Sequence, residues 1–481
     1  MWISVILVIL CFLGVIICIL TEKLNRAIAS LIGTIITYFV LIFLEGFDFA
    51  IIVDLLFGNI EDGFVNLHSI ILILAMMIIV VISTEAGLFQ FIALRLIQLS
   101  KGKSIRLLII ICFITVLISA VLNNILTVII LIPLIITVSR ILNIDPSPYI
   151  LTQAVLVNIG GTVFSISSIP NILITTEASI SFVSFFLNVG LLSFMVFGFT
   201  LIFFILLYRK ELVVPSEGIE ILKEFDAWAF VPDKILLYKS LVTLITLMTL
   251  FVVLPSYIFS PDILALTIAI ILVIISGLEP KELIKKIDFE LLLYLLGIFI
   301  ITGAFELVGV TSALANIFTF LGGTDLFIQI LVILWISAFL SSSIDNIPIT
   351  KVLIPVIGDM TAAGTTYVKN QAFYALTFGA NWGDNLTPMG DNILVVNIAE
   401  QNKRPISMKA FFKLGFFTTT YQLLILSLYF TFVFHFVIGF VISFTILILI
   451  LILYIVYKTG TLRVRSKLDK LINLIRKVII K

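Results

Sequence analysis

The chain has 481 residues, of which 61% are hydrophobic and only 12% are charged, and its mean hydropathy is +1.29. No water-soluble domain can hide so much apolar surface, so this composition excludes a soluble protein and predicts an all-α polytopic membrane protein. The formal net charge of +1 gives no footprint of nucleic-acid binding. Three cysteines within apolar runs form neither a disulfide framework nor a metal-ligand spacing.

Apolar runs predict one series of elements that occurs twice along the chain. In the first half we expect spans at Ile3–Leu20, Ala27–Leu44 and His68–Ser83, an interfacial helix at Gly87–Ser100, a hairpin within Arg106–Arg140, an interrupted span at Tyr149–Thr176 and a span at Phe182–Tyr208. In the second half we expect spans at Leu241–Leu254, Ile263–Ser276 and Leu291–Thr302, an interfacial stretch at Glu306–Leu321, a hairpin at Leu326–Ile357, an interrupted span at Gln371–Ile398 and a span at Phe411–Phe434.

The predicted domain organisation follows from this repeat. It comprises a first repeat at residues 1–208, a cytoplasmic linker at 209–239, a second repeat at 240–435, an extra transmembrane span at 436–457 and a cytoplasmic tail at 458–481. The tail carries eight bases and one acid, and its leucines and isoleucines fall on one helical face. Such a basic amphipathic segment suits the anionic cytoplasmic leaflet of a membrane.

Each half has a polar tip inside its hairpin. The first tip is Ser119–Asn124 and the second is Ser341–Asn346. About fifteen residues flank each tip on either side, and at ~1.5 Å per residue such arms fall short of a bilayer core of about 30 Å. We therefore predict two re-entrant hairpins, because polar backbone at membrane depth is tolerated only where it lines a cavity or is buried in protein.

Lysine and arginine positions predict the orientation of the chain. Basic clusters, such as Lys23 with Arg26, mark cytoplasmic turns, whereas the loop Glu45–Asp62 has five acids and no base, which suits an outside location. Following these marks gives an outside N-terminus and a cytoplasmic C-terminus, with the first hairpin entering from the cytoplasm and the second from outside. We therefore expect two inverted repeats in a multi-pass protein of the cell membrane.

Candidate binding residues gather at the two tips and at the breaks of the interrupted spans. Neutral amides and hydroxyls suit a hydroxylated solute or a hard cation, and glycines suit backbone that approaches a ligand closely. Ionisable residues at membrane depth are costly, so the aspartates predict a site for a coupling Na⁺ or H⁺. The predicted substrate and ion site consists of Asn123, Asn124, Gly160, Gly161, Thr162, Asn171, Asp345, Asn346, Asp384, Asn385, Thr387, Asp391 and Asn392, with Na⁺ assigned to Asp345, Asp384 and Asp391.

Two structural alternatives stay open at the tips. Asparagine or aspartate at such a position can cap a helix end instead of binding a solute. Lys351, which follows in the second hairpin, can pair with Asp345 and neutralise the site, or it can extend its ammonium group outward.

No sequence motif of catalysis or nucleotide binding is present. The chain has no Gly-Lys-Ser/Thr phosphate loop, no His-Glu-x-x-His and no Gly-x-Ser-x-Gly. We therefore predict that the chain is not an enzyme, that it has no cofactor other than a coupling ion, and that it does not pump with ATP on its own. The expected partners are a small ion or oxyanion and the lipid bilayer, while a homodimer and a separate ATPase subunit stay open.

At these residues the chain resembles the arsenite permease and P-protein branch of the ion transporter superfamily, which has a citrate-transporter-like domain. The resemblance covers about residues 1–435 and is carried by Asp345-Asn-Ile-Pro-Ile-Thr, by Asn158-Ile-Gly-Gly-Thr with Pro170-Asn-Ile-Leu-Ile, and by Asn392-Ile-Leu-Val-Val-Asn-Ile-Ala-Glu400. It implies two inverted repeats, two re-entrant hairpins and elevator-like alternating access. The family often has an Asp-Asn pair in the first hairpin, where this chain has Asn123-Asn124.

Together these features predict a secondary active transporter of a small inorganic ion or oxyanion, coupled to H⁺ or Na⁺. Relatives implied by the resemblance include arsenite and antimonite exporters, Na⁺/H⁺ antiporters, and citrate or dicarboxylate carriers. The alternatives are therefore a Na⁺/H⁺ antiporter, a di- or tricarboxylate carrier, and a passive ion channel.

Overall fold

The computed structural model describes residues 2–21, 23–100, 103–209, 226–256, 258–362, 364–387 and 392–459, together with the single positions 470, 478 and 479. Within these residues every regular element is a helix. Nine helices in this part of the chain are long and apolar enough to cross a membrane, or ten if a bent pair, Val310–Gly322 with Leu326–Ser341, counts as one span. The predicted all-α polytopic fold is confirmed.

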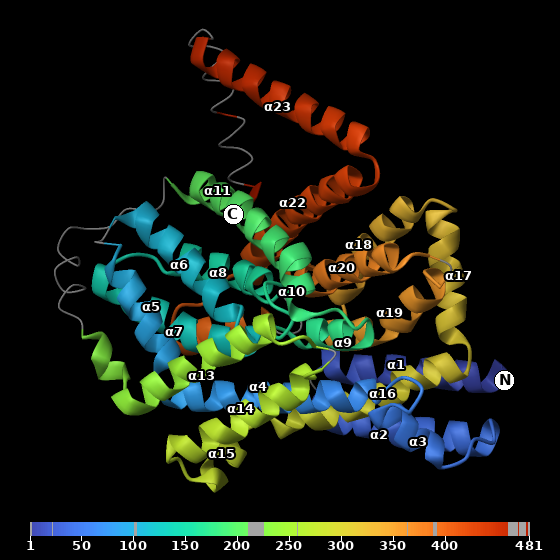
Figure 1. Cartoon of the computed structure of the whole chain (residues 1–481). Helices are drawn as coiled ribbons and strands as arrows, with labels where there is room; N and C mark the ends of the chain where they lie inside the picture. Colours follow the sequence, from blue (N-terminus) through green and yellow to red (C-terminus); the bar gives the residue numbers. More distant parts are fainter. Residues whose placement is uncertain are drawn as a thin grey trace.

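The helices of the first half follow the predicted order (Figure 1). They are α1 (Trp2–Leu20), α2 (Arg26–Phe39) with its π-helical extension η1 (Val40–Leu44), α3 (Ala50–Phe57), α4 (Val65–Glu85), α5 (Leu88–Gln98), α6 (Ser104–Ser119), α7 (Asn124–Leu142), α8 (Ser147–Gly160), α9 (Ile169–Glu177), α10 (Phe182–Phe185), η2 (Phe186–Gly190) and α11 (Leu191–Tyr208). Helix α3 lies within the acidic loop, and its eight residues are apolar except for Asp54.

The second half repeats this order. Its elements are η3 (Ala227–Phe230), α13 (Lys234–Val253), α14 (Pro261–Ser276), α15 (Pro280–Lys286), α16 (Phe289–Leu307), α17 (Val310–Gly322), α18 (Leu326–Ser341), α19 (Asn346–Met360), α20 (Thr366–Gly383), η4 (Asp384–Leu386), α21 (Asn392–Gln401), α22 (Met408–Phe434) and α23 (Phe436–Thr459). Residues 210–225 of the predicted linker and nearly all of the predicted tail lie outside the described residues.

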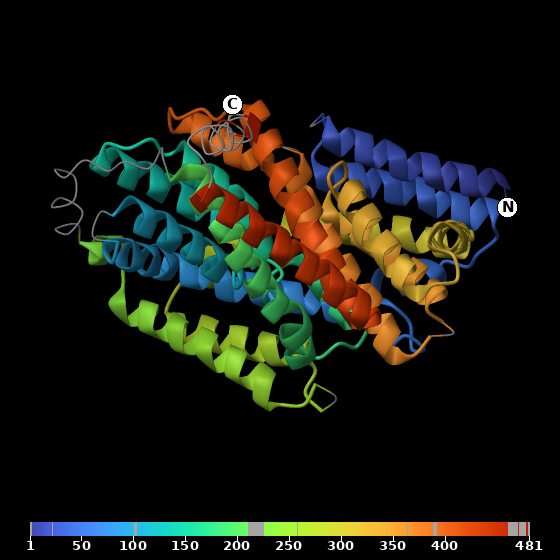
Figure 2. The same cartoon turned by 90° about the horizontal axis from the view of Figure 1, so that it is seen from above.

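The helices lie in two layers, which Figures 1 and 2 show from two directions. In one layer α2 packs along α16 and α4 packs along α14. In the other layer each hairpin packs on the broken helix of its own half, α6 on α8 and α18 on α20. Two further contacts connect the halves, because α9 packs on α19 and α7 packs on α21. These cross-half contacts bring the two hairpin tips to the same region.

The hairpin arms differ from the predicted lengths in one case. Helices α6, α18 and α19 have 16, 16 and 15 residues, which at ~1.5 Å per residue gives about 22–24 Å and is too short for a bilayer core. Helix α7 has 19 residues and is long and apolar enough to span a membrane. The prediction of a short arm is therefore wrong for the second arm of the first hairpin, because α7 begins at Asn124 within the tip and continues past the predicted end at Arg140 to Leu142.

Helix α23 extends away from the rest of the molecule in Figure 1 and packs chiefly on α22. Only Gly439 is buried along its length. An apolar helix with so little protein contact is stabilised by lipid rather than by the core. The structure therefore gives α23 no part in positioning the hairpins.

Truncation after Phe434 is expected to leave the remaining helices folded, since α23 contributes almost no buried surface. Size-exclusion chromatography of a fluorescent fusion in mild detergent would show a single symmetric peak. The control truncation removes α22 as well, and it is expected to aggregate because α22 packs on α18 and contributes ten buried residues. If the protein that lacks only α23 aggregates, the prediction is wrong.

Candidate functional site

The two hairpin tips meet at one small cavity. Its volume is about 40 Å³, roughly three times the ~10–15 Å³ that one buried water needs. The cavity is half open, and its enclosed part has room for a few heavy atoms. Both halves of the chain contribute to its lining, which consists of Arg26, Asn123, Asn124, Ile125, Ser168, Ile169, Pro170, Leu291, Asp345, Asn346 and Ile347.

Every residue of this lining lies at the N-terminal end of a helix. The helices are α2, α7, α9, α16 and α19, and each lining residue is either an N-cap or part of a first turn. Because the first backbone N–H groups of a helix have no partner within it, each N-terminus carries roughly half a positive charge. Five such ends and the guanidinium of Arg26 favour an anion, whereas the Asp345 carboxylate in the same lining favours a cation.

Local sequence explains why helices begin at the cavity. Asn123 Oδ1 accepts a hydrogen bond from the Leu126 amide at 2.9 Å, and Asp345 Oδ1 accepts one from the Ile347 amide at 3.3 Å. Ser168 caps α9 in the same way. The proline in the first turn of that helix costs no hydrogen bond, because a backbone N–H group there would have no partner within the helix. The capping alternative is therefore confirmed, and the same side chains also line the cavity.

Asp345 has a second contact, which differs from the one considered from the sequence. Tyr294 Oη donates a hydrogen bond to Asp345 Oδ2 at 3.2 Å. Lys351 Nζ instead donates to Asn66 Oδ1 at 2.8 Å and lies 3.6 Å from a carboxylate oxygen of Glu177. Lys351 therefore has its partners on α4 and α9, away from the Asp345 carboxylate.

Behind the first tip, three asparagines form a chain of hydrogen bonds. Asn124 Nδ2 donates to Asn158 Oδ1 at 2.5 Å, and Asn158 Nδ2 donates to Asn385 Oδ1 at 2.8 Å. Ser119 Oγ donates to the carbonyl oxygen of Val157 at 2.6 Å and so holds the end of α6 on α8. All three asparagines are buried. This chain of amides connects the first tip to the broken helix of the second half.

Behind the second tip, the buried carboxylate of Asp384 is the hydrogen-bond partner of the tip asparagine Asn346, whereas in the first half that partner is the amide of Asn158. Asp384 accepts hydrogen bonds from Ser341 Oγ at 2.9 Å and from Asn346 Nδ2 at 3.0 Å, so it connects both arms of the hairpin. In the first half Gly161 faces Asn124, since a Cβ atom there would lie 2.9 Å from Asn124 Oδ1. The two tips are thus built alike, but only the second has a charge at its base.

The breaks of the two interrupted spans also contact each other. Asn171 Nδ2 donates to the carbonyl oxygen of Gly161 at 2.7 Å, and Asn381 Nδ2 donates to Asn171 Oδ1 at 2.9 Å. Trp382 Nε1 donates to Thr162 Oγ1 at 3.0 Å. Asn381 Oδ1 is buried without a hydrogen-bond partner in the described part of the chain. A buried acceptor of this kind calls for a water or a cation.

The structure places the predicted site residues in different groups. Four of them line the cavity: Asn123, Asn124, Asp345 and Asn346. Asp384 is hydrogen-bonded to the lining residue Asn346, and Asn385 is connected to Asn124 through Asn158. The other predicted residues described in the structure lie outside the lining: Gly160, Gly161, Thr162, Asn171 and Thr387. Asp391 lies outside the described residues, and of Asn392 only the helical backbone is described.

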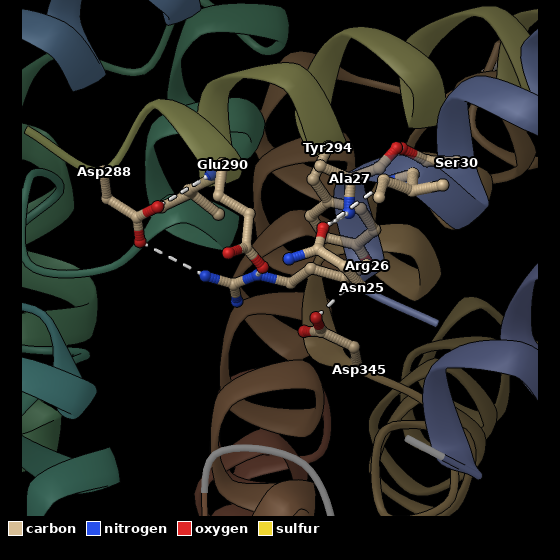
Figure 3. A network of polar contacts seen from close by, with 10 residues as sticks. Asn25, Arg26, Ala27, Ser30, Asp288, Glu290, Tyr294 and Asp345 are labelled. Atoms are coloured by element: carbon tan, nitrogen blue, oxygen red, sulfur yellow. Dashed lines mark hydrogen bonds and ion pairs between the residues drawn. The ribbon is translucent and has the colours of Figure 1, made fainter. Parts of the chain in front are cut away.

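Sequence reasoning missed Arg26, which it used only as a mark of a cytoplasmic turn. Arg26 Nη2 lies 3.2 Å from Asp288 Oδ2 and Arg26 Nε lies 3.3 Å from Glu290 Oε1, as Figure 3 shows. Asn25 caps α2 by accepting hydrogen bonds from the Ala27 and Ile28 amides. The dipeptide Asn-Arg directly before an apolar run was a signal for a helix start. Nothing local indicated that this start would face the tips.

Comparison with known proteins identifies a family and several relatives. The family model described as "Citrate transporter" (CitMHS) matches residues 16–379. A 46 kDa membrane protein of Mycobacterium leprae is 28% identical over 85% of this chain and 94% of its own length. An uncharacterised transporter of Mycobacterium tuberculosis is 29% identical over 77% of this chain and 86% of that protein.

Two further comparisons reach more distant proteins. The human P protein is 26% identical over 73% of this chain, which spans 52% of the P protein's length. The crystal structure of the YdaH transporter of Alcanivorax borkumensis superposes with a TM-score of 0.56 at 17% identity, covering 82% of this chain and 88% of that one. At this identity the likeness shows the fold alone. The family match over residues 16–379 and the apolar helices show that the chain belongs to the citrate transporter family of multi-pass membrane transporters.

Proposed function

We propose that the chain is a secondary active transporter that carries a small oxyanion and couples its movement to H⁺ or Na⁺. The observation that carries this proposal is the tip cavity, where five helix N-termini and Arg26 surround a volume of about 40 Å³. Partial positive charges aimed at one point favour an anion with charge on its oxygens. The cavity is small and half open, which suits a small oxyanion.

The coupling ion is assigned to the second hairpin. Asp345 lies in the cavity lining, and Asp384 contacts the neighbouring residue Asn346. A carboxylate at membrane depth is costly unless it binds a proton, a cation or hydrogen-bond donors, so such residues mark coupling sites in transporters. In the described residues no three His, Cys, Asp or Glu side chains are grouped as metal ligands. A bound Na⁺ would therefore use amide, hydroxyl and backbone oxygens beside one carboxylate.

Transport by the purified full chain in liposomes tests the proposal. Uptake of arsenite, silicate, sulfate and citrate is measured with an imposed Na⁺ gradient, with an imposed pH gradient, and with each gradient collapsed by an ionophore. We expect one of the two gradients to accelerate uptake of a small oxyanion. Uptake that ignores both gradients would support the channel alternative and contradict the proposal.

A Na⁺/H⁺ antiporter is the second candidate, and the buried Asp384 favours it. This carboxylate has an exposed fraction of only 6%, and it contacts the hairpin tip rather than the lipid. A protonatable carboxylate of this kind can alternate between H⁺ and Na⁺. A pH-sensitive dye inside the liposomes separates the two candidates. A pH change on adding Na⁺ without any oxyanion would identify antiport.

The variant Asp345→Asn is expected to slow gradient-driven uptake about ten- to a hundredfold while the protein stays folded. Asparagine caps a helix as well as aspartate does, so its single carbonyl oxygen can keep the bond from the Ile347 amide, while its Nδ2 group faces Tyr294 Oη, which can turn to accept. The variant therefore removes the charge and keeps the helix cap, and it reverses the direction of the hydrogen bond with Tyr294. Loss of one charge-assisted interaction of about 1.5–3 kcal/mol corresponds to this change in rate.

Asp325→Asn is the matched control for this variant. Asp325 caps α18 in the same hairpin, but it lies at the exposed end and far from the tip. Its replacement is expected to leave uptake unchanged. Equal rates for Asp345→Asn and the unmodified chain would remove Asp345 from the coupling site.

A further inference from the structure

Arg26 lies at one side of the tip cavity. It is the first residue of α2, and its side chain extends between the start of α16 and the second hairpin tip (Figure 3). Its guanidinium carbon lies 5.9 Å from the centre of the Tyr294 ring, and the hydroxyl of the same tyrosine donates to Asp345. Arg26 is thus part of the cavity lining and also part of a charged group outside the tips.

Two carboxylates hold Arg26 at the start of α16. Asp288 and Glu290 each have a side chain that is 45% exposed, whereas the Arg26 side chain is 21% exposed. Ion pairs with such exposed carboxylates contribute little net free energy, because water competes for both partners. An anion in the cavity would meet the N-termini of α7 and α19 as well as the guanidinium, so it would gain interactions that Asp288 and Glu290 lack. Asp288 and Glu290 are therefore weak enough partners to be exchanged.

Guanidinium geometry selects the kind of anion. Arginine presents five N–H donors in a planar fork, which matches two oxygen atoms bound to one central atom. The neighbouring N-termini of α7 and α19 add backbone N–H groups of the same polarity. Carboxylates and inorganic oxyanions share this chemistry, whereas a halide offers one centre only.

We propose that Arg26 is the residue that discriminates for oxyanions, and that Asp288 and Glu290 are its internal competitors. The substrate replaces these two carboxylates on the guanidinium when it enters the cavity. This inference rests on the proposed transport of a small oxyanion. It adds a specificity residue and an exchange of ion pairs, neither of which lies at a hairpin tip.

Opposite changes in substrate affinity test the exchange. Arg26→Gln is expected to raise the KM for the oxyanion roughly tenfold or more, because the fork is lost, with little change in maximal rate. Arg26→Lys keeps the charge but loses the planar fork, so its KM is expected to lie between the values for the unmodified chain and for Arg26→Gln. The double variant Asp288→Asn with Glu290→Gln is expected to lower KM by roughly three- to tenfold, since it removes the competitors and leaves the cap of α16 in place.

The matched control is Lys286→Gln. Lys286 forms an ion pair with Glu85 at 2.5 Å, with both side chains more than one third exposed, and neither residue lines the cavity. Its replacement is expected to leave KM unchanged. If Arg26 only clamps α2 to α16, then Arg26→Gln and the double carboxylate variant will both impair transport in the same direction. That result would overturn the inference.

Binding and transport are measured separately so that the two proposals can fail separately. The probes are sulfate and citrate, used in uptake by liposomes and in thermal stabilisation of the purified full chain at constant Na⁺ and ionic strength. Stabilisation by sulfate or citrate that Arg26→Gln abolishes supports the inference, and the probe that stabilises identifies the class of anion. Stabilisation without transport would contradict the proposed function alone. If neither probe stabilises the unmodified chain, the inference is wrong.

Discussion

Replacement of Asp384 with asparagine is expected to abolish gradient-driven transport. The Asp384 carboxylate accepts from Ser341 Oγ at 2.9 Å and from Asn346 Nδ2 at 3.0 Å, and an asparagine amide would turn an N–H group toward one of these two donors. Hydrogen bonds to a charged group contribute about 1.5–3 kcal/mol each. Loss of one would therefore lower the equilibrium constant for forming the folded tip roughly ten- to a hundredfold. Loss of the charge also removes the candidate cation ligand.

Asp359→Asn provides the comparison for this variant. Asp359 lies near the other end of α19, is exposed, and accepts one hydrogen bond from Ser312 at 2.9 Å. We expect its transport and thermal stability to match those of the unmodified chain. Uptake in liposomes and the Tm of both variants are the measurements. Coupled transport by Asp384→Asn at the normal rate would exclude Asp384 as a coupling residue.

Replacement of Gly383 with valine is expected to prevent folding of the second hairpin. A Cβ atom on Gly383 would lie 2.3 Å from the carbonyl oxygen of Ala338 and 2.6 Å from its Cα atom. Gly379 lies one turn earlier in α20, and a Cβ atom there would be equally close to Ser337, which, like Ala338, belongs to α18. A small residue at every fourth position lets two membrane helices approach closely. Because the obstacle is backbone, we expect a loss of at least about 3 kcal/mol.

Gly198→Val tests whether the position or the residue type matters. Gly198 lies in α11 with no atom within 4 Å of its virtual Cβ, so a side chain there is expected to extend into open space or lipid. Expression level and a monodisperse peak of a fluorescent fusion measure folding of both variants. A normal peak for Gly383→Val would mean that α18 and α20 are not packed as described.

The two halves share a construction but differ in charge. Each tip has a serine at the end of its first arm and an asparagine at the start of its second, and each hairpin packs on a broken helix of its own half. The differences are Asn123 against Asp345 and Gly161 against Asp384. We propose that this asymmetry assigns the coupling ion to the second half and leaves the first half to the substrate.

Hydropathy and helix-start signals predicted most of the elements. The spans, the hairpins and the breaks near Gly160 and Gly383 depend on side chains that are adjacent in the chain. The length of α7 was underestimated, because its arm was expected to have about fifteen residues and to end by Arg140, whereas the helix begins at Asn124 within the tip and ends at Leu142. The acidic residues around α3 likewise concealed a short apolar helix.

The site depends on contacts between residues that are far apart in sequence. Arg26 lines the cavity with Asp345, and Asn158 bonds to Asn385, although each pair is separated by more than two hundred residues. Local patterns can show that a helix begins at Asn25 or Asn123, but not that the two beginnings face each other. The sequence alone thus predicted a membrane transporter with two polar tips. Long-range packing of α9 on α19 and α7 on α21 placed five positive helix ends around one cavity and put Arg26 among them.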